Sequence, residues 1–95
     1  MSENRIRRVA IKRTTSAGQI DIRAEAEVTG SEGAVQVVTS SGVQGIPSGA
    51  DAVNLKEMED TQLSELRKRL YAAGHSKRAI ATAVKDVVRV ESRGH

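Results

Sequence analysis

Residues 19–28 alternate between apolar and polar side chains without a break, and this pattern constrains the fold more than any other. The apolar members are Ile20, Ile22, Ala24, Ala26 and Val28. Because successive side chains of a strand point to opposite sides, the segment predicts a β-strand with one buried and one polar face. A face of this kind must be covered by another layer of structure.

Two further strands are expected beside this one. Residues 5–13 alternate imperfectly, and residues 34–39 are rich in valine. Turn residues such as Gly18 separate the three segments. We therefore expect a three-stranded antiparallel β-meander over residues 5–40, followed by an ordered loop over residues 41–50 that leads to helices.

Two amphipathic α-helices are predicted after this loop. Apolar residues recur at helical intervals over residues 51–74 and again over residues 76–91. Gly74 is the expected stop between them and Ser76 the expected cap of the second helix. The last residues, 92–95, are expected to be a frayed tail.

The charges of the first helix suit its dipole. A start near Asp51 or Asn54 places Glu57, Glu59 and Asp60 early in the helix, and Arg67, Lys68 and Arg69 fall near its end.

The fold class is thus α+β, in a single domain over residues 1–95. With no Phe or Trp and with one Tyr in the chain, the core must consist of aliphatic side chains. The residues predicted to be buried together are Ile20, Ile22, Val37, Leu63, Leu66, Leu70, Ile80, Val84 and Val87. Large aromatic anchors are missing, so support from a second subunit or another partner is expected.

The absence of cysteine excludes disulfides and thiolate metal sites. The N-terminal residues are polar and basic, with no apolar run behind them, so neither a signal peptide nor a membrane anchor is expected. The predicted location is the cytoplasm.

Charge is distributed unevenly along the chain. The net charge is +3, with basic segments over residues 1–13 and 63–95 and an acidic segment over residues 14–62. We expect Arg8 and Lys12 to pair across the sheet with acids of the 19–28 strand, namely Asp21, Glu25 or Glu27.

Candidate catalytic residues are few. The histidines are His75, at the junction of the two helices, and His95, the last residue. No acidic or histidine cluster has the spacing of a metal site, and no glycine-rich phosphate loop is present. We therefore predict a protein that is not an enzyme and that holds no metal or cofactor.

A basic helical face is the best candidate for a functional surface. Arg78, Lys85, Arg89 and Arg93 follow one another at intervals of seven, four and four residues, which on a helix places them along one edge. With the end of the first helix, the candidate surface for nucleic acid or an acidic partner comprises Arg67, Lys68, Lys77, Arg78, Lys85, Arg89 and Arg93. The lack of an accompanying aromatic disfavours stacking on single-stranded bases.

Parts of the chain resemble known families. The stretches Val37–Ile46, Asp51–Leu55 and Gln62–Leu66 are similar to small uncharacterised phage and prophage proteins, in which a strand leads through a Gly-x-x-Gly-Ile turn to a helix. This resemblance implies a mobile-element origin and no particular activity. Ala73–Ala81 resembles the first half of a transposase-type helix-turn-helix.

A further resemblance is to ribbon-helix-helix regulators. It rests on Val53–Lys56 followed by two helices that are split at Gly74–Ser76. It implies DNA binding by a dimer, with Asn54 and Lys56 facing the major groove.

The leading functional prediction is a small interaction or regulatory protein that acts by protein–protein contact, with a partner or with itself as a homodimer. The alternative is a DNA-binding regulator that uses the basic helical face.

Overall fold

The computed structural model describes residues 5–30 and 33–93. Its first two strands, β1 (Arg5–Ser16) and β2 (Gln19–Thr29), form a long antiparallel hairpin, as the alternating pattern predicts. Both residues of the two-residue turn have positive φ, the second being Gly18 at 74°. Turns of this kind match the twist of paired strands.

The two faces of the hairpin differ as expected. All five apolar side chains at alternate positions of β2 are buried. On the opposite face, Lys12 forms an ion pair of 2.9 Å with Glu25, which confirms one of the predicted cross-strand pairs. Arg8 lies opposite Glu27 in the β1–β2 register.

The predicted loop over residues 41–50 contains a strand. Both β3 (Val35–Thr39) and β4 (Val43–Pro47) pair antiparallel with β2, so together they form an interrupted edge strand. Between β3 and β4, the hydroxyl of Ser40 accepts a hydrogen bond from the backbone N–H of Ala24 at 3.0 Å, which ties the interruption to β2. Beside it, the N–H of Gly42 donates to the side chain of Gln62 at 2.9 Å.

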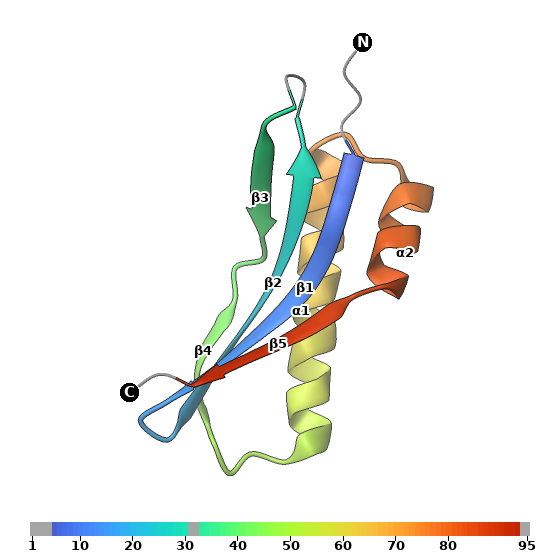
Figure 1. Cartoon of the computed structure of the whole chain (residues 1–95). Helices are drawn as coiled ribbons and strands as arrows, with labels where there is room; N and C mark the ends of the chain where they lie inside the picture. Colours follow the sequence, from blue (N-terminus) through green and yellow to red (C-terminus); the bar gives the residue numbers. More distant parts are fainter. Residues whose placement is uncertain (1–4, 31–32, 94–95) are drawn as a thin grey trace.

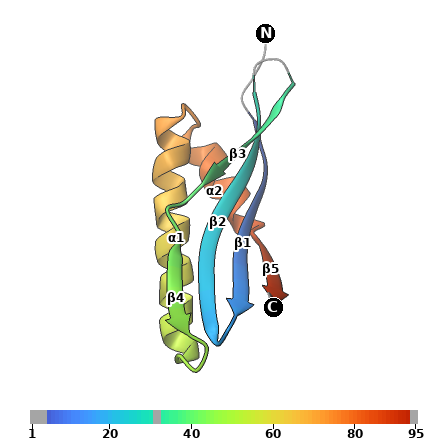
Figure 2. The same cartoon turned by 90° about the vertical axis from the view of Figure 1, so that its left-hand side faces the viewer.

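The first helix, α1 (Ala52–Ala72), packs across β2 on the buried face of the sheet (Figures 1 and 2). Its cap is Asp51, which accepts a hydrogen bond from the N–H of Val53 at 3.1 Å. Because the helix begins at Ala52, Glu57, Glu59 and Asp60 lie beyond its first turn. The expected match between these acids and the helix dipole is therefore wrong.

The second helix is shorter than predicted. Ser76 caps α2 (Lys77–Lys85) as expected and accepts a hydrogen bond from the N–H of Ala79 at 3.1 Å, but the helix ends at Lys85 and not at residue 91. The valine-rich segment that follows forms β5 (Val88–Arg93), which pairs in parallel with β1.

The complete sheet is therefore mixed and has five strands in the order β3-β2-β1-β5, with β4 also on β2. The α+β class is confirmed, while the three-stranded antiparallel meander is wrong in strand number and in direction. Of the expected tail at 92–95, residues 92 and 93 belong to β5, and residues 94 and 95 lie outside the described residues.

The core consists of two adjoining clusters under α1. One joins Leu66, Leu70, Ile80 and Val84 to apolar residues of β1 and β2, and the other contains Ile20 and Ile22. Leu63 and Val87 are half-buried and pack against both clusters. The predicted burial is confirmed for the other six residues, whereas Leu63 and Val87 pack against the core but are partly exposed.

Val37 is the exception, with 57% of its surface exposed. It lies opposite Glu27 in the β2–β3 register, on the polar face of the sheet. Val38 is the residue of β3 that packs against the core. Figure 2 shows that the helices lie on one side of the hairpin. Within residues 5–30 and 33–93, no helix is long and apolar enough to cross a membrane.

Candidate binding surface

The seven predicted surface cations come from three elements. Arg67 and Lys68 lie on α1, whereas Lys77, Arg78 and Lys85 lie on α2. Arg89 and Arg93 belong to β5, so the expected stripe along one long helix is wrong. The 3.6-residue periodicity ends at Lys85 because the chain becomes extended after it.

Arg89 is occupied by an ion pair. Its guanidinium donates to both carboxylate oxygens of Glu59, at 3.1 and 2.8 Å. Arg13 donates to the same carboxylate at 2.7 Å and lies 3.6 Å from Glu91. Glu59 is only 3% exposed. Because it lies on α1, Arg13 on β1 and Arg89 on β5, the cluster joins these three elements.

Sequence reasoning missed the Glu59 cluster. The three residues that meet at its centre lie far apart along the chain, and their contact requires β5 to run beside β1. Two arginines on one buried carboxylate satisfy its charge and its hydrogen-bonding capacity, which is typical of a structural network.

Four of the five predicted cations on the two helices, all but Arg78, surround a groove. This α1/α2 groove has a volume of about 640 Å³ and lies between the end of α1 and α2. Its lining residues are Arg67, Lys68, Tyr71, Lys77, Ile80, Ala81, Val84 and Lys85. None of them is acidic.

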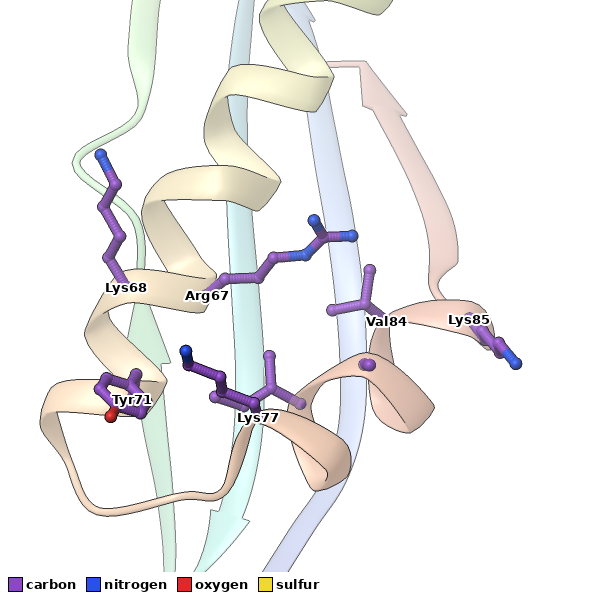
Figure 3. Close-up of a pocket in the computed structure, with 8 residues that line it drawn as sticks. Arg67, Lys68, Tyr71, Lys77, Val84 and Lys85 are labelled. Carbon is purple, nitrogen blue, oxygen red and sulfur yellow. The ribbon is translucent and has the colours of Figure 1, made fainter.

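The floor of the α1/α2 groove is apolar. Ile80 and Val84 are each less than a tenth exposed, and they sit one helical turn apart on α2 with Ala81 beside them. In Figure 3, Arg67 extends from α1 toward Val84, while Lys68 and Lys85 point away from each other at the two sides. An apolar floor is thus framed by positive charge.

Tyr71 forms one end of this groove and is 57% exposed. The ammonium of Lys77 lies 5.7 Å from the centre of its ring, within the range of a cation–π interaction. The only tyrosine of the chain, which has no Phe or Trp, therefore lies at this groove.

Arg78 does not line the α1/α2 groove. It faces a second hollow, between α2 and the upstream part of β1, which Arg5, Arg7 and Arg8 also line. Among the described residues, none of these four arginines takes part in an ion pair. Of the two cross-strand ion pairs predicted for the N-terminal strand, the one of Lys12 is therefore confirmed, while Arg8 forms none among the described residues.

The described candidates for other chemistry, His75, Asn54 and Lys56, line neither of these two hollows. His75 is buried at the junction of the helices, and its backbone N–H donates to the carbonyl of Leu70. His95 lies outside the described residues. Asn54 and Lys56 are exposed at the start of α1. The described ranges hold no group of three potential metal ligands among histidine and acidic residues.

The chain matches no known family model, no curated protein and no solved structure. The chemistry of its own surface is therefore the basis for any functional proposal.

Proposed function

We propose that this protein is a non-enzymatic binding module that acts by contact with another protein through the α1/α2 groove. The observation that carries the proposal is the combination of an apolar floor with a rim of four cations and no acid. Burial of an apolar face supplies affinity, whereas rim charges select the partner and speed association.

An amphipathic acidic helix is the partner segment that fits best. Ile80 and Val84 are four residues apart on α2, and Arg67 and Tyr71 have the same spacing on α1. Rows of this spacing are the ridges between which a third helix packs. Apolar side chains of that helix would cover the floor, and flanking Asp or Glu would meet the rim.

DNA is the alternative partner, and the floor of the groove argues against it. Phosphates pair with cations but gain nothing from Ile80, Ala81 and Val84. Moreover, Arg89 already binds Glu59, so it is not available to a phosphate backbone without loss of that contact.

The proposal is tested by selection from a displayed library of random helical peptides, followed by titration. We expect enriched peptides to carry acids beside an apolar stripe. Lys77→Glu combined with Lys85→Glu should weaken their binding by about tenfold or more. Lys56→Glu makes the same charge reversal at a single exposed position outside the groove, and it should leave binding unchanged.

A duplex DNA titration at low and moderate salt forms the second arm. Counterion release makes phosphate binding fall steeply as salt rises. If duplex DNA binds in that manner and no acidic helix is enriched, the DNA-binding alternative replaces this proposal.

A further inference from the structure

The upstream part of β1 has an edge without a strand beside it. β1 pairs with β2 along nearly its whole length, but it pairs with β5 only from Ala10 to Thr15. Beside Arg5–Val9 lies α2 instead (Figure 1). Within the described part of the chain, no hydrogen bond joins α2 to β1. An edge of this kind offers backbone donors and acceptors to an added strand.

A hollow of about 740 Å³ runs along this edge and is bounded by α2, and we refer to it as the β1/α2 groove. Its walls include apolar side chains, with Ile6 and Val9 from β1 and Ala79 and Ala83 from α2. Val9 is 1% exposed and Ile6 is half-buried, so they form the base. An extended segment placed here would contact both backbone and apolar surface.

Positive charge dominates the groove. Arg5, Arg7, Arg8 and Arg78 line it, with Asp86 as the one acid among its lining residues. The β1–β2 register shifts between Ile6 and Arg8, so Arg7 is an extra residue in β1. The shift accounts for two adjacent arginines at this edge, because a bulge changes the direction of the side chains around it.

We propose that the β1/α2 groove binds an extended acidic segment of a partner protein, which joins the sheet as a strand beside Arg5–Val9. The charge opposes pairing with the same edge of a second copy of this chain, since two identical edges would bring their arginines together. Backbone pairing gives the affinity, and acids at alternate positions of the segment meet the arginines.

A strand suits this groove better than a nucleic acid does. A phosphate backbone offers acceptors but no regular row of N–H donors, so the carbonyl groups of the edge would stay unpaired. The groove also lies across α2 from the α1/α2 groove, and Lys77 and Lys85 do not line it. Its occupancy is therefore independent of the function proposed above.

Three synthetic peptides of about six residues, the usual strand length, provide the test. The first alternates Val and Glu, the second alternates Val and Lys, and the third is the acidic peptide with N-methyl groups on alternate amides. The N-methylated peptide keeps its charge but loses donors. Binding is measured by anisotropy, and hydrogen exchange of the Arg5–Val9 amides is followed by NMR.

We expect the acidic peptide alone to bind and to slow exchange at this edge. Arg7→Glu combined with Arg78→Glu should weaken binding by at least about tenfold. Arg93→Glu, at an exposed position of β5 outside both grooves, should have no effect. A Lys77→Glu/Lys85→Glu protein should still bind this peptide, which separates the two proposals.

Three results would overturn the inference. The first is absence of binding by the acidic peptide at millimolar concentration. The second is equal binding by the N-methylated peptide, because charge alone would then be responsible. The third is tighter binding of a single-stranded oligonucleotide that competes with the acidic peptide, which would assign the arginines to phosphates.

Discussion

Glu59 is the buried charged residue that links α1 to two strands of the sheet. Its buried carboxylate receives hydrogen bonds from Arg13 and Arg89, which themselves lie on different strands. A change here leaves two arginines without their shared counter-charge, so it affects three elements at once.

We expect Glu59→Gln to lower the free energy of unfolding by roughly 2 kcal/mol, the scale of hydrogen bonds to charged groups. The partial exposure of both arginines limits the loss. Glu57→Gln, on the exposed side of the same helix, is the matched control. Urea denaturation measures both, and equal stability of the two variants would show that the cluster contributes nothing.

The contact of Arg89 with Glu59 also changes the expected effect of reversing the charge of Arg89. A reversal of Arg89 to Glu would be harmless on the outer face of a helix. In the structure it would place two carboxylates together, so we expect it to destabilise the fold. Lys85 has no ion-pair partner among the described residues, so its charge reversal can test binding, whereas a variant that also reverses Arg89 would lose the contact with Glu59 and cannot.

Gly74 is a residue whose backbone conformation determines how the helices meet. Its φ of +103° is strained for any residue with a Cβ, although an added Cβ would meet no atom within 4 Å. Gly74→Ala should therefore cost about 1 kcal/mol or more through strain alone. Gly49→Ala has equal space and no positive φ, so thermal unfolding should show little change for it.

At the scale of elements, the caps and the strongly periodic segments could be predicted from local sequence. The β1–β2 hairpin and the start of α2 at Ser76 follow from side chains that act on their own neighbours, as does the start of α1, expected near Asp51 or Asn54 and capped by Asp51. The end of α2 could not be predicted in this way. Val84, Val87 and Val88 suit a helical face, yet β-branched residues also favour strands.

The choice between these two structures depends on a distant element. The free edge of β1 downstream of Ala10 offers backbone partners to the chain after Lys85. Local periodicity contains no information about that edge. For the same reason the sequence groups the candidate cations only in part. Arg67, Lys68, Lys77 and Lys85 line one groove, whereas the other three predicted cations, Arg78, Arg89 and Arg93, do not line it.

The cap of α2 gives a prediction at this scale. Ser76→Ala removes the acceptor for the N–H of Ala79, and we expect a loss of about 1 kcal/mol in stability. Ser64→Ala, at an exposed position inside α1, should be neutral or slightly stabilising because alanine favours helices. A cap variant as stable as this control would mean that packing alone holds α2.

At the scale of the whole molecule, no local sequence pattern indicates where α2 lies in the fold. It contributes Ile80 and Val84 to the core, and it separates the α1/α2 groove from the β1/α2 groove. The proposed partner segments, one helical and one extended, would thus bind on either side of one short helix. Homodimer formation stays a prediction from the small aliphatic core, and sedimentation over a range of micromolar concentrations would test it.

The central claim is that the α1/α2 groove receives an acidic amphipathic helix, and Tyr71 permits its most direct test. Because the chain has one tyrosine and no Phe or Trp, the signals of the Tyr71 ring can be assigned readily and followed during a titration. We predict that a selected acidic helix shifts the Tyr71 ring signals together with the methyl signals of Ala81 and Val84. Val35 and Val37, on the opposite face of the sheet, should not move. Saturation by the helix with the Tyr71 signals unchanged would contradict the account.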